Sequence, residues 1–305
     1  MNNEIIAIQQ MLDDNRFNPK LMREILAHYQ DHPAVIPCKI LTDAKIIRSS
    51  LNEENQFHQN VTRLNYPPVE YARTDRASLK GKPMFYASVF TSAYKDGAYP
   101  RVISALETTD ILRGFKKTGK VCTTQSAWKS NRDLNLIAFP FSKKYKKPCK
   151  EILFQRKFWD DEYSKYWSSD FSEFSEYISD LLATPAYSCL YDITATTIDY
   201  LLNESSLSED TDGIMYPSVW GEGEGMNICL KTNVVDKHIS FESASVQLVL
   251  KKQEQATMFG IADSVLFPNG ELKWKITKIA FELLRHEYGI EHMLSENMVY
   301  LGDET

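Results

Sequence analysis

The sequence predicts one main domain of the α/β or α+β class, because strand-like and helix-like segments are interspersed along the chain. Short apolar runs typical of strands alternate with segments whose apolar residues recur at helical spacing. The chain has 305 residues, of which 43% are hydrophobic and 12% aromatic, so it can bury a sizeable core. These observations predict a globular fold and exclude disorder as a description of the whole chain.

Residues 1–40 are expected to form a helical N-terminal extension. Its clearest element is Pro19–Tyr29, where a proline stands near the start and three apolar residues share one helical face. The His-Pro pair at 32–33 is expected to end this helix, since the residue before a proline avoids helical geometry.

Residues 41–250 are expected to form the main domain. The run MFYASVF is aromatic and apolar, which is typical of a buried strand. The segment RVISALETTDIL suits an amphipathic helix, and Pro185 separates two further helices. A glycine-rich turn lies between the last two strands. Strands are expected at 44–50, 84–90, 134–139, 213–216 and 226–231, and helices at 101–112, 171–182 and 187–202.

Residues 251–305 are expected to pack on the same domain as a hairpin and a late helix. The segment FPNGEL places Asn-Gly between apolar alternations, a strong hairpin signal. The late helix is expected over Ile276–Tyr288.

Composition narrows the functional classes. No apolar run reaches 18 residues and no basic segment leads into an apolar one at the start, so neither a membrane span nor a secretory signal is expected. Five cysteines without a CxxC pair indicate a reducing compartment, and we expect a cytoplasmic protein. A net charge of −6 argues against nucleic acid as the main partner.

Charge is unevenly distributed along the chain. Segment 113–157 holds 13 Lys and Arg against two acids, and segment 160–212 holds 13 acids against one base. The favoured interpretation is two solvated faces that attract each other. The alternative is a basic surface for an anionic ligand or an acidic partner.

Several catalytic motifs are weak or absent in the sequence. Gly221–Gly225 (GEGEG) lacks the Lys-Ser/Thr ending of a phosphate loop, and a turn between strands is expected there. His238 is the one histidine considered as a base, although a lone histidine is more often structural. No HExxH or GxSxG pattern is present, so no metal site and no serine hydrolase are expected.

Four stretches contain residues whose places in the sequence are not explained by packing alone. They are IIRSS with Arg48, DRASLKGKPMFYAS with Arg76 and Tyr86, SALETT with Glu107, and GIMYPSVWGEGEGMNICLK with Ser218. Their order resembles the RES domain family, named for its Arg, Glu and Ser. The resemblance covers about residues 40–250, and the YPSV block is its most specific part.

The resemblance implies a fold like that of ADP-ribosyltransferases, with a mixed sheet core and surrounding helices. It also implies cleavage of the nicotinamide–ribose bond of NAD as a glycohydrolase or phosphorylase, with NAD as substrate and no further cofactor. The family pattern places Asn two positions after the second arginine, where this chain has Ser78. The assignment of arginines therefore stays open between Arg48 and Arg63, and between Arg76 and Arg73.

Each residue has an expected role in such a site. Arg48 and Arg76 would clamp the diphosphate, since guanidinium groups match phosphate oxygens bidentately. Glu107 would stabilise the positive charge that develops on the ribose. Tyr86 would offer a flat face to the nicotinamide ring, and Ser218 would hydrogen-bond the ribose or the amide.

The resemblance also implies a biological setting and leaves alternatives. Family members act as bacterial toxins of toxin–antitoxin or defence systems, paired with an Xre-type antitoxin, so an inhibitory protein or self-assembly into a homo-oligomer is expected. One alternative is an ADP-ribosyltransferase that modifies a protein target. The other is a non-catalytic interaction module that keeps the fold.

Overall fold

The chain folds around one eleven-stranded sheet in the order β1-β5-β6-β7-β3-β2-β4-β8-β9-β10-β11. Neighbouring strands are antiparallel except for the parallel pairs β5–β6 and β10–β11. This computed structural model describes residues 2–29, 35–52, 57–90, 100–145, 147–185, 189–276 and 298–300 and positions 280, 282, 285 and 286. The mixed sheet with its surrounding helices confirms the predicted α+β class. Within these ranges, no helix has the length and apolarity needed to cross a membrane.

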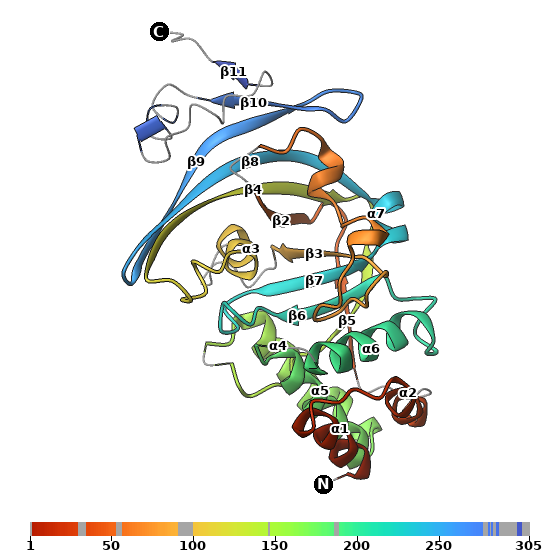
Figure 1. The fold of residues 1–305 in the computed structure, drawn as a ribbon. Helices are drawn as coiled ribbons and strands as arrows, with labels where there is room; N and C mark the ends of the chain where they lie inside the picture. The colour runs from red at the N-terminus through yellow and green to blue at the C-terminus, as the bar shows by residue number, and fades with distance from the viewer. Residues whose placement is uncertain are drawn as a thin grey trace.

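The strands differ in length, and three of them are much longer than the rest. The strands are β1 (Ile36–Ile40), β2 (Lys45–Leu51), β3 (Met84–Val89), β4 (Thr118–Ser130), β5 (Leu134–Ala138), β6 (Gly213–Pro217), β7 (Met226–Lys231), β8 (Ile239–Lys252), β9 (Gln255–Leu266), β10 (Leu272–Ile276) and β11 (Met298–Tyr300). The long strands β4, β8 and β9 curve together, and α3 lies under their concave side (Figure 1).

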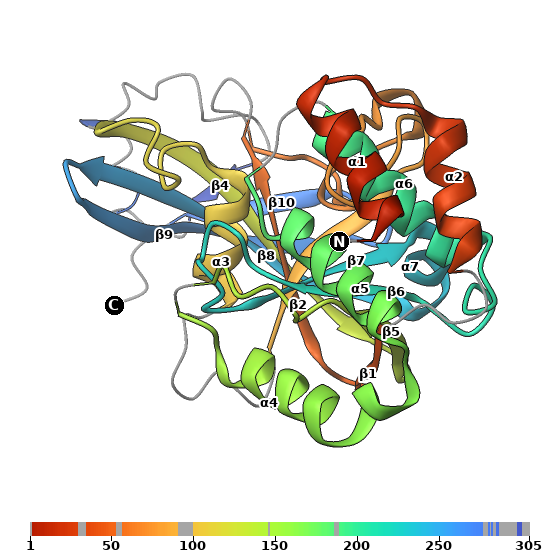
Figure 2. The ribbon, with the colours of Figure 1, turned by 90° about the horizontal axis from the view of Figure 1, so that it is seen from below.

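The helices gather mainly at the β5–β6 end of the sheet, away from β9–β11 (Figures 1 and 2). They are α1 (Asn3–Asp13), α2 (Pro19–His28), α3 (Pro100–Thr108), α4 (Lys150–Phe158), α5 (Ser169–Leu182), α6 (Cys189–Asn203) and α7 (Thr232–His238). Helix α2 begins as expected, with Pro19 in its first turn and the Asn18 side chain accepting from the Leu21 N–H.

The sheet separates two hydrophobic cores, because successive side chains of a strand point to opposite faces. On β3, Phe85 and Val89 belong to the core that includes Trp128 and Trp274. Tyr86 packs against the other core, which α1, α2, α5 and α6 cover. The amphipathic α5 and the strongly buried α6 therefore seal one face of the β5–β6–β7–β3 region.

Most elements predicted in the main domain are confirmed within a few residues, and so is the Asn-Gly hairpin between β9 and β10. Two outcomes differ. Ile36–Ile40 is a strand paired with β5, so the helical description of residues 1–40 is wrong for that segment. Ile276 ends β10, so the late helix does not start there. Of its remaining residues, 280, 282, 285 and 286 are helical, and the others lie outside the described residues.

The strand β4 was not predicted, because its sequence TGKVCTTQSAWKS is polar. It lies between β2 and β8, and its residues 122–128 are buried. Apart from Thr123, whose hydroxyl has no partner among the described residues, its buried polar side chains hydrogen-bond to neighbouring segments and to α3. Thr124 donates to Asn52 Oδ1 at 3.1 Å, and the Gln125 amide donates to the Arg101 carbonyl at 2.7 Å. Buried polar groups are tolerated when they are paired in this way.

The two oppositely charged segments contact each other within the chain, as the favoured interpretation expects. Arg132 makes a bidentate ion pair with Asp212 at 2.7 and 2.8 Å. Lys144 lies 3.8 Å from Asp180, and Lys157 pairs with Asp161. The bidentate pair lowers the pKa of Asp212, whose partial burial alone would raise it. Much of the basic segment is therefore matched internally, while the lysines near the start of β4 are not among these pairs.

We predict that Gly213→Ala destabilises the fold. An added Cβ would lie 2.2 Å from the Cys229 carbonyl oxygen and 2.9 Å from the Leu230 Cα, and both are backbone atoms of β7. Overpacking of this kind costs about 1–3 kcal/mol of unfolding free energy, measurable by urea titration. The matched control is Gly260→Ala, whose Cβ would meet nothing nearer than 3.6 Å. Equal stability of the two variants would contradict the close approach of β6 and β7.

Candidate functional site

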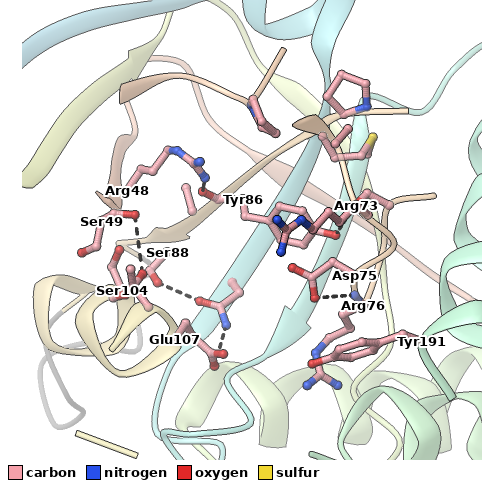
Figure 3. Close-up of a pocket in the computed structure, with 18 of the residues that line it drawn as sticks. Arg48, Ser49, Arg73, Asp75, Arg76, Tyr86, Ser88, Ser104, Glu107 and Tyr191 are labelled. Carbon is pink, nitrogen blue, oxygen red and sulfur yellow. Dashed lines mark hydrogen bonds between the residues drawn. The ribbon is translucent and has the colours of Figure 1, made fainter. Parts of the chain in front are cut away.

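A cavity of about 600 Å³ lies among β2, β3, β7 and the C-terminal end of α3, beside the loop at residues 71–78. Its volume is within the range of about 300–1,000 Å³ found for small-molecule sites. Figure 3 shows side chains from these elements converging on it. Four of the five predicted site residues line it: Arg48, Arg76, Tyr86 and Glu107. The fifth, Ser218, lies behind Glu107.

The Glu107 carboxylate is held through one oxygen. Its Oε1 accepts from the Ser218 hydroxyl at 2.6 Å, the Val219 N–H at 3.0 Å and the Asn227 amide at 3.1 Å. Oε2 accepts no hydrogen bond from any described residue. The carboxylate is therefore oriented, with one oxygen available to a ligand.

Ser218 has a different place from the one expected. Its side chain is fully buried, and it does not line the cavity. Its hydroxyl donates to Glu107 and accepts from the Gly221 N–H at 3.0 Å. Both hydrogen-bonding functions of the hydroxyl are thus used inside the protein. This arrangement places Ser218 outside the cavity lining, where its hydroxyl holds the Glu107 carboxylate.

The glycine-rich turn explains how Ser218 reaches α3. The Ser218 N–H donates to the Gly225 carbonyl at 2.8 Å, and the Gly223 N–H donates to the Ser218 carbonyl at 2.9 Å. Gly223 has φ +88°, which favours glycine. At Gly221, an added Cβ would lie 2.8 Å from Ile103 of α3 and 2.9 Å from the Ser218 hydroxyl. The expected turn therefore also brings the β6–β7 connection against α3.

Asn227 is a site residue that sequence reasoning did not select. It lies on β7 opposite Ser88 of β3, and the Ser88 hydroxyl donates to its Oδ1 at 2.7 Å. This contact turns the Asn227 NH₂ group toward Glu107, to which it donates at 3.1 Å. A buried polar residue inside the otherwise apolar strand MNICLK is the signal that could have identified it.

Arg48 enters the cavity from β2. One terminal nitrogen donates to the Tyr86 carbonyl at 2.7 Å, and the guanidinium lies 5.5 Å from the Phe85 ring centre. Its Nε is buried and has no hydrogen-bond partner. Burial lowers the pKa of Arg48 to about 10, which keeps it charged at neutral pH. Its remaining donors can serve an anion in the cavity.

Arg76 is 4% exposed and joins two parts of the fold. It donates to the carbonyls of Leu182, at the end of α5, and Thr184. Its guanidinium lies 5.6 Å from the ring centre of Tyr191 on α6. These contacts bring the loop 71–78 against the helices, with the positive charge at the cavity wall (Figure 3).

Tyr86 forms part of the wall. Its hydroxyl accepts from the Ala77 N–H at 2.9 Å and donates to the Ser78 hydroxyl at 3.0 Å. Burial raises the pKa of Tyr86 well above its usual value. Its hydroxyl is therefore engaged in the fold and neutral, which suits a wall against which a planar ring can pack and does not suit an acid or base.

Two arginine assignments were left open by the sequence, and the structure distinguishes the candidates in only one of them. Arg63 lines an adjoining cavity of about 1,430 Å³ and not the cavity at Glu107, whereas Arg48 lines both. Arg73 and Arg76 both line the cavity at Glu107. Arg73 is exposed, so it could engage a ligand beside Arg76.

Two further residues that line the cavity, Arg113 and Trp220, were not selected from the sequence. Arg113 was counted only as part of the basic segment, yet it donates to the carbonyls of Leu106 and Glu107 at the end of α3. Side chains commonly cap helix carbonyls in this way. Its guanidinium lies 5.1 Å from the ring centre of Trp220, which lines the same cavity. His238, by contrast, ends α7 and does not line the cavity.

The described residues contain no cluster of three or more His, Cys, Asp or Glu side chains that could hold a metal ion. No protein-family model matches the sequence, and no curated protein matches it. The resemblance to the RES domain family therefore stays a prediction. The cavity is lined by four arginines and by the carboxylates of Asp75 and Glu107. This set of charges suits an anionic ligand that also has a cationic part.

We predict that Ser218 and Glu107 are energetically coupled. Ser218→Ala removes a hydrogen bond to a charged group and leaves the Gly221 N–H without its partner, which should cost about 1.5–3 kcal/mol of unfolding free energy. In a double-mutant cycle with Glu107→Ala, the coupling should be about 0.5–3 kcal/mol. Additive effects would mean that this contact does not position the carboxylate.

Proposed function

We propose that this protein binds NAD in the cavity at Glu107 and cleaves its nicotinamide–ribose bond. The observation that carries the proposal is the Glu107 carboxylate, oriented by three donors and presenting its second oxygen to a cavity lined by arginines. The order of the sequence stretches that resemble the RES domain family supports the same substrate. We also propose that the protein works in the cytoplasm.

Cleavage of the nicotinamide–ribose bond is favoured by an anionic oxygen near the ribose. When the bond between ribose C1′ and the pyridinium nitrogen breaks, its electron pair goes to that nitrogen, and neutral nicotinamide leaves. Positive charge develops on C1′ and the ring oxygen, as in glycoside cleavage. Glu107 Oε2 would stabilise this charge, and a carboxylate fixed in advance needs no reorganisation at that moment. Addition of water to C1′, with loss of a proton, completes hydrolysis to ADP-ribose.

The arginines suit the other half of the substrate. Arg48 and Arg76 are each held by backbone carbonyls and form no ion pair with a carboxylate of the described residues. Both cations can therefore bind a diphosphate without first breaking an ion pair, which suits this part of the substrate. Tyr86 offers its ring to the nicotinamide.

Transfer of ADP-ribose to a protein is the second candidate. The cavity at Glu107 shares Arg48, Ser49, Arg73 and Thr108 with the adjoining cavity of about 1,430 Å³. That opening leaves room for an acceptor side chain beside the ribose. Chromatography of the products distinguishes the two reactions, because hydrolysis releases free ADP-ribose and transfer leaves it on protein.

The first functional prediction concerns Glu107→Gln. The amide oxygen can replace Oε1 toward its three donors, so the variant should fold, but the negative charge is lost. Nicotinamide release should fall by about 10²-fold or more. The matched control is Glu242→Gln, an exposed residue of β8. A wild-type rate in folded Glu107→Gln would remove Glu107 from the mechanism.

The second functional prediction compares two arginines by calorimetric titration with NAD. Arg48→Ala removes a cation from the cavity at Glu107, so its affinity should fall by about tenfold or more. Arg63→Ala, in the adjoining cavity, should bind within about twofold of wild type. The opposite ranking would place the diphosphate in the adjoining cavity.

A further inference from the structure

The far end of the β4–β8–β9 ribbon has a surface that the proposed reaction does not use. In the register of the sheet, Thr118 pairs with Lys252 and Lys252 pairs with Gln255, so the start of β4, the end of β8 and the start of β9 meet there. Figure 2 shows this end projecting beyond the helices. We call it the ribbon tip and define it as residues 115–121 and 249–260.

The ribbon tip is strongly basic. It holds five lysines, at 116, 117, 120, 251 and 252, against one acid, Glu254. Lys116, Lys117, Lys251 and Lys252 form no ion pair with any residue that the structure describes. This contrasts with Arg132, Lys144 and Lys157 of the same basic segment, which pair with acids of the chain. Two unmatched lysines of the segment, Lys116 and Lys117, therefore lie at the tip beside the equally unmatched Lys251 and Lys252.

The tip also offers an edge of the sheet. β9 pairs with β8 over residues 255–260, but β10 pairs only with residues 262–266 of β9. On the side away from β8, residues 255–260 thus pair with no described strand. Five of these six residues are exposed, and Phe259 is 40% exposed. Such an edge can accept one more strand through its backbone groups.

One residue of the tip contacts the wall of the cavity. Phe115 is 57% exposed, and its ring meets that of Trp220 edge to face at 5.3 Å between centres. Trp220 lines the cavity and stacks with Arg113. A partner on the tip would therefore contact a residue that touches the wall of the site.

We propose that the ribbon tip is a docking surface for an acidic protein partner, which adds an extended acidic segment to the free edge of β9. Charge complementarity selects this occupant, because four of the tip lysines form no ion pair with any residue that the structure describes. The exposed aromatic rings supply apolar contacts beside the added strand. The proposal does not depend on the reaction carried out in the cavity.

The test uses the full chain and a fluorescein-labelled peptide of about ten residues in which glutamate and valine alternate, a pattern that suits an added strand. Fluorescence anisotropy should show binding that weakens as salt is raised. Lys116→Glu combined with Lys117→Glu should weaken the affinity by about tenfold or more. The matched control, Lys144→Glu with Lys147→Glu, changes the net charge equally away from the tip and should have less than about a twofold effect.

A second peptide tests the edge. Methylation of alternate backbone nitrogens keeps the charge and removes donors for strand pairing, so binding should fall by about tenfold. Equal binding of the two peptides, or equal affinity of the tip and control variants, would overturn the proposal. Tighter binding of a single-stranded oligonucleotide would make the tip a nucleic-acid surface instead. A dimer seen in sedimentation and lost in the tip variant would make a second copy the occupant.

Discussion

The arrangement of the site depends on the set of hydrogen bonds to Glu107 Oε1. Its donors come from the turn after β6 and from β7, while Glu107 itself lies on α3. The contact therefore connects a helix to two strands far along the chain, at 107, 218 and 227. Three donors on one oxygen restrict the carboxylate to one orientation, and they compensate the cost of its partial burial.

Polar contacts hold both ends of α3, in addition to its buried apolar residues Ile103 and Ala105. Arg101, at its start, lies 3.4 Å from both the Gln125 side-chain oxygen and the Ser245 hydroxyl. The Gln125 amide donates back to the Arg101 carbonyl. At the other end, Arg113 caps the last carbonyls. Directional contacts at both ends fix the height and rotation of the helix more strictly than apolar packing alone, which tolerates sliding.

Local sequence was enough to predict α2 from its apolar spacing, β3 from its aromatic and apolar run, and the hairpin after β9 from Asn-Gly. It could not predict β4. Whether TTQS is buried depends on β2 and β8, which lie far away in the sequence. The same limit applies to the site. The order of the stretches identified Arg48, Glu107 and Ser218, but only the turn at 218–225 shows that Ser218 faces the carboxylate and not the cavity.

Carboxylates and backbone carbonyls differ in what they do to the charge of an arginine that they hold. A carboxylate partner would both orient an arginine and neutralise it. A backbone carbonyl orients the guanidinium with a dipole and leaves its net charge in place. Arg48 and Arg76 are both held by carbonyls. The carboxylate of Glu107 has Ser218, Val219 and Asn227 as partners, none of which carries a charge. Arg48, Arg76 and Glu107 are therefore each held by uncharged groups, so a ligand with separated charges can meet them without first breaking an ion pair among them.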